Sequence, residues 1–566
     1  MEAYDKLDYK YAKILKKELP ELTFSDLLFF PTDYVLRCVN GYYQGRQVRL
    51  KSLGNEIIIG SSDKCNLNIK SSNLSDEHCK LKYIDETIFY TIEDLNSETG
   101  TWKKISNLEN YFEIKRDYTE FIFFDYKFFI EKTDPNSKTN SKYKLRFINN
   151  ISKDNKNNGV NINNISNCNF TSNDISLEDG CDLTIGKQNC VIELDIPTSE
   201  NQKFNITNHN NKVYISNTTE EITNDGLFYK INTSDVTLLR AGDVIMIGNC
   251  HFRLLVHNWG ITTELGNKNK QEDRYCIVDD LRIFDEVVVP FYAVYDGHGG
   301  FYCSEFLQKN FHKNIKDIIG LRKVKESKNI LVDLANAIQE AVIYTDFSYY
   351  KNSFSAPNQG STCVATIFIA NKILCCNLGD SIAILNYKKD DIKVFLSKDF
   401  KPTREIEIDR LRSKNAKINN EGRLLGDITV SRSFGDWRYK DPTKPENVKK
   451  VDGPIVYGEY TMSNRPEFRI FDIDPSSMDY VIIVSDGVFQ YSSYQSVFDI
   501  INKYLEIEKD DNINNLINIP TVTDNVRLDI INKIHGGTVN KRHVTADNMT
   551  LILVHLNNDN YLHGFE

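Results

Sequence analysis

Residues 292–300 read Tyr-Ala-Val-Tyr-Asp-Gly-His-Gly-Gly, an apolar run that ends in an aspartate, a glycine and a histidine. The apolar part predicts a buried strand, and the Asp-Gly pair predicts where that strand ends. Apolar runs border three further aspartates: Asp380 after 374–378, Asp486 after 481–484 and Asp547 before 549–554. Strand ends in a packed sheet are rigid, so the sequence predicts that these carboxylates are gathered in one place.

The rest of residues 258–566 alternates strand-like runs with amphipathic helical patterns. Two sets of apolar residues each fall on one helical face: Cys303, Phe306, Leu307, Phe311 and Ile315, and Leu331, Leu334, Ile338, Ala341 and Val342. Strand pairs alternate with helix pairs instead of following a strict strand-helix-strand order. This pattern predicts an α+β domain with antiparallel sheets and helices on the outside.

The N-terminal half has a different sequence pattern, with strand-like runs and few helical ones. Residues 34–132 and 177–256 consist of short β-type runs with turn signals, which predicts two all-β sandwiches. Between them, residues 133–176 are expected to be a linker, because Asn occupies 11 of the 28 positions from 149 to 176. Residues 1–33 form an extension whose spacing of Tyr11, Ile14, Leu15 and Leu19 predicts one helix.

Composition narrows the class of protein. The 566 residues carry 69 basic and 79 acidic side chains, a net charge of −10, so we expect no nucleic acid and no membrane as partner. We see no secretory signal and no apolar run long enough to span a bilayer. The 12 cysteines include no Cys-x-x-Cys pair, and several lie in apolar runs. We therefore expect reduced thiols, a cytoplasmic or nuclear location, and a monomer.

Five acidic motifs in the C-terminal half point to a metal. Besides the three aspartates above, they include Glu272-Asp273 and Asp296. Carboxylates that share a site repel one another, and a divalent cation removes that repulsion. Oxygen ligands suit the hard ions Mg²⁺ and Mn²⁺. For any single Asp-Gly pair, an ordinary turn is the simpler interpretation.

Residues 258–556 resemble the metal-dependent serine/threonine protein phosphatases of the PPM (type 2C) family. Eight motifs occur in the family's order: Gln271–Tyr275, Tyr295–Gly300, Gly360–Val364, Asn377–Ser381, Lys398–Pro402, Val430–Asp436, Ser485–Phe489 and Ala546–Thr550. The resemblance implies two antiparallel sheets packed face to face, with helix pairs outside. It also implies hydrolysis of phosphoserine and phosphothreonine in a phosphoprotein substrate by a water that two Mn²⁺ or Mg²⁺ ions activate.

The resemblance assigns roles residue by residue. Asp296 would bridge the two metals, and the carbonyl of Gly297 would bind one of them. His298 would be the general acid. The remaining ligands would be Asp486 and Asp547 at the second metal, Glu272 and Asp273 through water, and Asp380 at a weaker third metal. Because Glu272 and Asp273 are adjacent, they can serve one metal pair only if the chain departs from a regular strand or they act through water.

Four positions depart from the family pattern. Lys268 replaces the phosphate-clamping arginine, so it keeps the charge but loses the bidentate fork. Gln490 replaces an aspartate, which puts the third metal in doubt. Phe400 and Ile382 replace a histidine and an arginine outside the metal shell, where we interpret them as structural. The segment 437–465 corresponds to the family's substrate-contacting flap, and its lysines, Lys440 included, are expected to be solvated.

Residues 34–132 resemble a forkhead-associated domain, a sandwich that reads phosphothreonine. Ser75 and His78 match the family's serine and histidine, whereas Ser61 replaces its phosphate-reading arginine and Thr99 its asparagine. Residues 177–256 resemble a second, more degenerate copy in which Lys187 stands at the arginine position. The leading hypothesis is therefore a phosphatase with targeting modules. The alternative is a catalytically weak scaffold that acts through its forkhead-associated-like domains.

Overall fold

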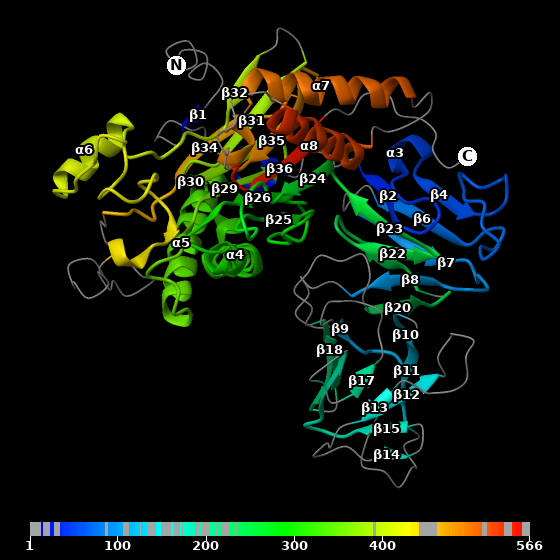
Figure 1. Ribbon diagram of the computed structural model, residues 1–566. Coiled ribbons are helices and arrows are strands. Elements are labelled where there is room, and N and C mark those ends of the chain that lie inside the picture. The colour runs from blue at the N-terminus through cyan, green and yellow to red at the C-terminus, as the bar shows by residue number, and fades with distance from the viewer. Residues whose placement is uncertain are drawn as a thin grey trace. The chain divides into compact units, whose positions relative to one another are not determined.

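The computed structural model describes residues 13–14, 23–27, 34–84, 89–105, 112–124, 126–133, 143–148, 160–162, 170–171, 174–186, 190, 192–194, 203–210, 212–217, 227–233, 235–388, 392–440, 461–474, 476–490, 492–511, 518–536 and 546–556. The chain divides into two compact units (Figure 1). The C-terminal unit comprises residues 1–35, 47–49 and 255–564, and the N-terminal unit comprises residues 36–46, 50–254 and 565–566.

Two antiparallel sheets form the centre of the C-terminal unit. The first has the order β1-β34-β30-β29-β26-β25, with β1 Lys13–Ile14, β34 Glu467–Asp472, β30 Lys372–Leu378, β29 Cys363–Ile369, β26 Phe291–Tyr295 and β25 Arg274–Val278. The second has the order β24-β36-β35-β31-β32, with β24 Asn258–Glu264, β36 Met549–His555, β35 Met478–Val484, β31 Ile382–Tyr387 and β32 Lys393–Phe395. A small third sheet joins β27 Gly297–His298, β28 Gly360–Ser361 and β33 Phe434–Gly435.

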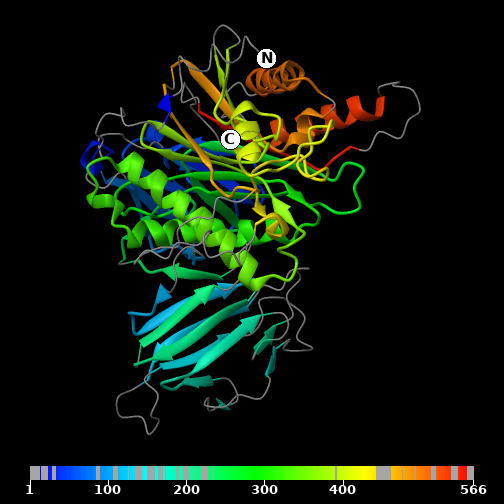
Figure 2. The ribbon, with the colours of Figure 1, turned by 90° about the vertical axis from the view of Figure 1, so that its left-hand side faces the viewer.

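The two large sheets pack face to face. Val294 and Val364 of the first sheet share one buried apolar cluster with Ile483 and Ile552 of the second. Helices α4 (Tyr302–Leu321) and α5 (Ile330–Asn352) lie side by side in the same unit, as Figure 2 shows in green, and α4 contacts β25 and β26. Helices α7 (Tyr494–Asp511) and α8 (Ile519–Gly536) cover the outer face of the second sheet. The predicted α+β class with antiparallel sheets and external helix pairs is confirmed.

Short elements complete this unit. They are α2 Phe24–Leu27, η1 Val324–Glu326, α6 Glu405–Ser413, η2 Trp437–Tyr439 and η4 Asp486–Phe489. The helix predicted across residues 1–30 is wrong at Ile14, which lies in β1 and pairs with Arg469 of β34. Tyr11, Leu15 and Leu19 lie outside the described residues. A short edge strand forms at Ile14 because β34 offers backbone partners that the local pattern cannot reveal.

The N-terminal unit consists of β-sandwich modules built from three sheets. One sheet has the order β21-β7-β6-β4-β5, with β21 Thr237–Leu239, β7 Phe89–Asp94, β6 Cys79–Ile84, β4 Glu56–Gly60 and β5 Leu67–Asn68. A second has the order β13-β17-β16-β18-β19-β9, with β13 Val160–Ile162, β17 Ile192–Leu194, β16 Asp182–Gly186, β18 Lys203–His209, β19 Lys212–Asn217 and β9 Phe112–Glu113.

The third sheet is long and runs through both modules. Its order is β14-β15-β12-β11-β10-β20-β8-β22-β23-β2-β3, with β14 Phe170–Thr171, β15 Asp174–Leu177, β12 Tyr143–Ile148, β11 Tyr126–Lys132, β10 Tyr118–Phe123, β20 Leu227–Ile231, β8 Thr101–Lys104, β22 Val244–Ile247, β23 Cys250–Leu255, β2 Val35–Asn40 and β3 Gln47–Arg49. Helix α3 spans Leu50–Leu53. Strand β20 pairs with β10 on one side and with β8 on the other.

Two modules are present, but one is nested within the other. Strand β4 pairs in parallel with β5 and antiparallel with β6, and β16 repeats this with β17 and β18. The burial pattern along β4 and β16 is also identical. However, residues 237–255 pair with β7 and β8 of the first module. The second module thus occupies roughly residues 112–231 and interrupts the first.

This pairing corrects the boundaries expected at 132 and 177. Residues 118–132, which the sequence pattern places in the first sandwich, pair within the second, and the closing strands placed in the second belong to the first. The predicted linker at 133–176 also contains strands, since residues 143–148 pair with β11. Local patterns mark strands equally well in both modules, and only long-range pairing assigns them to one or the other.

Candidate active site

The four strand-bordering aspartates lie where the sequence pattern predicts. Asp296 follows β26 and Asp380 follows β30 in the first sheet. Asp486 opens η4 directly after β35, and Asp547 precedes β36, both at the second sheet. The facing sheets bring these residues close enough for the charges of Asp486, Asp380 and Asp547 to raise the pKa of Asp296.

Glu272 and Asp273 come from the segment just before β25, so neither is part of a regular strand. The Glu272 backbone N–H donates to Oδ1 of Asn548 at 2.8 Å, which ties this segment to the loop that carries Asp547. Asp273 is buried, and its Oδ2 accepts a hydrogen bond from Ser485 Oγ at 2.8 Å. The departure from a regular strand resolves how two adjacent carboxylates can reach one site.

The buried carboxylates raise one another's pKa values. Burial, followed by the charges of Asp273 and Asp486, raises the pKa of Asp296 well above its ordinary value. Burial is also the main cause that raises the pKa of Asp273 and of Asp380 to about 7. The pKa of Glu272 is raised in the same direction, again mainly by burial. Such a group of carboxylates is stable as anions only if a cation neutralises it.

The residues fit a hard divalent cation. All donors are oxygens, and Oδ1 of Asp273 is buried with no hydrogen-bond partner. Within the described ranges, no three His, Cys, Asp or Glu side chains already stand in the arrangement of a metal site. The carboxylates thus lie within electrostatic range of one another without forming a closed coordination shell. Oxygen-only donors of this kind suit Mg²⁺ or Mn²⁺.

Close packing holds Gly297 in place. A Cβ at this position would lie 2.4 Å from the backbone oxygen of Glu272, so a side chain would push the Glu272 segment away. The neighbouring Gly299 and Gly300 have φ of 71° and 136°, in the left-handed region that favours glycine. The glycines of this motif therefore let the chain turn tightly beside the carboxylates.

His298 has a partner that the sequence analysis did not assign. Its Nε2 lies 2.6 Å from Oδ2 of Asp436, which is buried and also accepts a hydrogen bond from Ser433 Oγ at 2.6 Å. Burial alone would lower the pKa of His298, but the charge and hydrogen bond of Asp436, together with the charges of Asp380 and Glu272, raise this pKa. Asp436 is the last residue of the motif Val430–Asp436. Its place in that motif was the one sequence feature that could have marked it as a site residue.

Lys268 and Gln490 both contact the loop that carries Asp547. Lys268 Nζ lies 3.0 Å from Oδ1 of Asp547, and its pKa is raised because this contact outweighs burial. Oε1 of Gln490 accepts a hydrogen bond from the Asp547 backbone N–H at 2.9 Å. The resemblance expects an aspartate that binds a third metal at position 490. Here Gln490 instead holds the loop that carries Asp547.

A buried aspartate holds the chain on both sides of residues 441–460, which lie outside the described part. Asp346 accepts hydrogen bonds from four groups: the Gly435 backbone N–H, Trp437 Nε1, Lys440 Nζ and Asn464 Nδ2. The expectation that Lys440 is solvated is wrong, because its side chain is fully buried 2.9 Å from Asp346. The other flap lysines, Lys444, Lys449 and Lys450, lie outside the described residues.

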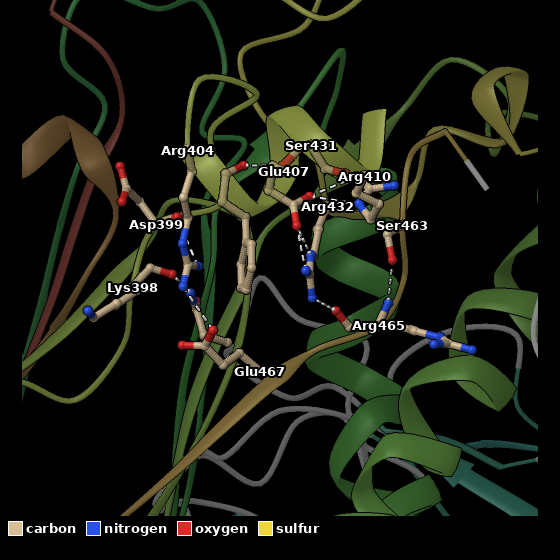
Figure 3. A network of polar contacts seen from close by, with 12 residues as sticks. Lys398, Asp399, Arg404, Glu407, Arg410, Ser431, Arg432, Ser463, Arg465 and Glu467 are labelled. Carbon is tan, nitrogen blue, oxygen red and sulfur yellow. Dashed lines mark hydrogen bonds and ion pairs between the residues drawn. The ribbon is translucent and has the colours of Figure 1, made fainter. Parts of the chain in front are cut away.

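A second polar network joins the motifs at 398–402 and 430–436, and Figure 3 shows its side chains. Buried Glu407 accepts hydrogen bonds from Arg410 at 2.7 Å and from Arg432 at 3.1 Å. The Arg432 and Arg404 guanidinium groups lie 3.8 and 4.5 Å from the centre of the buried Phe400 ring. These contacts support a structural interpretation of Phe400.

In the first sandwich, the side chains at the expected phosphothreonine site bond within the module. Ser75 Oγ accepts from the Glu98 backbone N–H at 3.0 Å, and Ser61 Oγ donates to the Leu74 carbonyl at 3.1 Å. His78 is buried, and its Nε2 lies 3.1 Å from the Gly100 carbonyl oxygen. Lys187 of the second copy lies outside the described residues.

Comparison with known proteins agrees with both resemblances. Residues 259–520 match the family model of protein phosphatase 2C, and residues 57–116 match that of the FHA domain. A bovine integrin-linked kinase-associated serine/threonine phosphatase 2C is 25% identical over 354 residues, which cover 60% of this chain and 87% of that protein. A probable protein phosphatase 2C 27 from Arabidopsis thaliana is 28% identical over 45% of this chain and 62% of its own length.

Among solved structures, a serine-threonine phosphatase 2C from Toxoplasma gondii is 17% identical and covers 53% of this chain and 94% of that one, with a TM-score of 0.41. The family models thus identify a protein phosphatase 2C domain at residues 259–520 and an FHA domain at residues 57–116.

Proposed function

We propose that this chain hydrolyses phosphoserine and phosphothreonine esters of proteins with the help of Mn²⁺ or Mg²⁺. The carboxylates of Asp296, Asp486 and Asp273 support the proposal, because they converge from both sheets and the charges of Asp273 and Asp486 raise the pKa of the buried Asp296. The buried, unpartnered Oδ1 of Asp273 adds to it. The chain aligns with 87% and 62% of the length of the two relatives named above. The activity of the whole protein is therefore part of this proposal.

In this proposal each acidic residue has a separate task. Asp296, the Gly297 carbonyl, Asp486 and Asp547 would hold two ions, while Glu272 and Asp273 would act through water, and Asp380 would serve a weaker third ion. When bound, two such ions would neutralise the phosphate charge and lower the pKa of a water that they hold. Lys268, beside Asp547, supplies a positive charge near the phosphate.

His298 would return the proton that the leaving serine or threonine oxygen needs. Its Nε2 is held by Asp436, which leaves Nδ1 as the nitrogen that can face the leaving oxygen. Asp436 favours the protonated imidazole, the form of His298 that can donate this proton.

The test is hydrolysis of a phosphothreonine peptide by the full chain across a manganese titration. Asp296→Ala should abolish the manganese-dependent rate, whereas Asp317→Ala, which removes an exposed carboxylate of α4, should leave it unchanged. Equal rates in wild type and Asp296→Ala would reject the proposal.

The departures at two positions support a second candidate, a weakly active scaffold. Lys268 is bound to Asp547, and the side chain of Gln490 is engaged by the same loop. The double variant Lys268→Arg, Gln490→Asp should raise the rate several-fold if the natural enzyme is attenuated. Partner capture by the N-terminal unit with no turnover at saturating Mn²⁺ would favour the scaffold.

Two further proposals concern the binding partners of the N-terminal unit and the cellular location of the protein. The FHA modules would bind protein partners, with a weak phosphothreonine contact at most, because Ser61 and Ser75 already have partners inside the module. A cytoplasmic or nuclear location agrees with eleven free cysteines among the described residues. In the part of the chain that the structure describes, no helix is long and apolar enough to cross a membrane.

A further inference from the structure

An exposed aromatic cluster borders the candidate active site. Phe354, in the loop after α5, is 90% exposed, and Tyr302, the first residue of α4, is 45% exposed. Their ring centroids lie 6.1 Å apart, and the ring of Phe301 lies 4.6 Å from that of Tyr302. We call Phe301, Tyr302 and Phe354 the aromatic platform. Single exposed apolar residues are common, but contiguous ones mark a contact surface.

The platform is held next to His298 by the backbone. Tyr302 donates its N–H to Oε1 of Gln359 at 3.1 Å, and Gly360, the next residue, pairs with His298 in the small third sheet. Gly300 packs so closely on the Gln359 side chain that a Cβ there would lie 2.3 Å from it. Residues 298–302 and residues 359–360 therefore pack against each other, and this packing holds the platform next to His298, the candidate general acid.

Basic side chains line one side of the platform. Lys270 Nζ lies 5.6 Å and Arg274 Cζ 5.3 Å from the Phe301 ring centroid. Both residues flank Glu272 in the sequence, and Arg274 Nη1 donates to the backbone carbonyls of Gln271 and Asp273, so the basic edge belongs to the segment that carries Glu272. A ligand that covers this surface needs an apolar group for the rings and negative charge for the two cations.

We propose that the aromatic platform binds the polypeptide on one side of the phosphorylated residue and selects substrates with an apolar side chain next to acidic ones. This inference rests on the proposed function, because it names the substrate class of that site. Because the platform lies beside His298, the polypeptide of the substrate is favoured over other occupants of this surface. A second copy of this chain, docked through the same rings, is the competing occupant that the test must exclude.

The test compares kcat/KM for three probes at saturating Mn²⁺. They are a phosphothreonine peptide with Leu and Glu near the phosphothreonine, the same peptide with Ser in place of Leu, and free O-phosphothreonine. Phe354→Ala should lower the value for the first probe about fivefold to tenfold and leave the other two unchanged. Lys270→Ala should reduce the preference for Glu, and this preference should weaken at high salt.

Leu321→Ala is the matched control, because Leu321 is 82% exposed at the far end of α4. Nineteen residues at about 1.5 Å each place it roughly 28 Å from Tyr302. It should change none of the three values. The proposal is overturned if Phe354→Ala affects all three probes equally or affects none. It is also overturned if that variant changes only self-association in sedimentation velocity.

Failure of the platform can be told apart from failure of the phosphatase proposal. If wild type hydrolyses none of the probes, the phosphatase proposal fails, and the platform is judged by fluorescence anisotropy of the labelled first peptide. Phe354→Ala should then weaken binding by a similar factor, while Leu321→Ala should not. Equal affinities of wild type and Phe354→Ala would overturn the platform by itself.

Discussion

Replacing Asp346 by Asn tests whether one buried carboxylate organises the chain around the candidate general acid. The side chains of Asp346 and Lys440 are both fully buried, and they lie 2.9 Å apart. Asparagine keeps the shape but removes the charge, so the buried Lys440 ammonium loses its counter-ion and keeps only neutral partners, among them the Ser433 carbonyl at 2.8 Å and the Trp437 ring at 5.6 Å. Leaving such a charge uncompensated costs about 3–5 kcal/mol.

The assay is urea unfolding of the full chain, analysed by linear extrapolation and followed by tryptophan fluorescence. Trp437, one of the three tryptophans of the chain, donates a hydrogen bond to Asp346 and stacks on Tyr350 at 4.5 Å, so part of the emission comes from this region. We expect Asp346→Asn to lower the free energy of unfolding by about 3–5 kcal/mol. The variant Glu326→Gln should change it by less than about 0.5 kcal/mol, because Glu326 and its partner Lys323 are both 73% exposed.

A double variant separates charge from shape. Lys440→Met removes the buried ammonium, so Asp346→Asn combined with Lys440→Met should recover part of the loss. A change in Asp346→Asn no larger than in Glu326→Gln would refute the reasoning. No recovery in the double variant would show that the unpaired charge is not the cause.

Three further predictions concern the same unit and its neighbour. Asp436→Asn should lower the pKa of His298, because the charge and hydrogen bond of Asp436 are the largest causes that raise it. The alkaline limb of the kcat profile should then move to lower pH, with kcat above neutral pH reduced about tenfold or more. An unchanged profile would contradict the pairing. Glu407→Gln should lower the free energy of unfolding by about 2–4 kcal/mol, and this cost should shrink as acid titrates Glu407 through its lowered pKa in the wild type. Asp409→Asn, whose ion pair with an arginine is exposed, should cost less than about 0.5 kcal/mol, so equal effects of the two would count against the network. A fragment of the N-terminal unit that stops at residue 132 lacks β21 and β22, which pair with β7 and β8, so it should give no cooperative unfolding transition by circular dichroism. A fragment that also contains β21–β23 should fold. A stable shorter fragment would disprove the nesting of the two modules.

The sequence was sufficient for the strands that lead into the aspartates and for helices α4 and α5 of the C-terminal unit. Apolar runs that end in Asp296, Asp380 and Asp486 mark strands whose period and length are local properties. The helical faces of α4 and α5 are likewise visible in the spacing of apolar residues. Expected roles of individual residues in the site remain predictions, but their positions at strand ends follow directly from these patterns.

Only the tertiary structure decided which distant groups meet. Asp436 reaches His298 across 138 positions of sequence, and Asp346 collects donors from both sides of residues 441–460. Similarly, residues 237–255 close the first sandwich after the second has interrupted it, although their pattern suits either module. Strand periodicity and side-chain type are local, whereas pairing depends on which backbone edges and buried charges remain unsatisfied once the chain has folded.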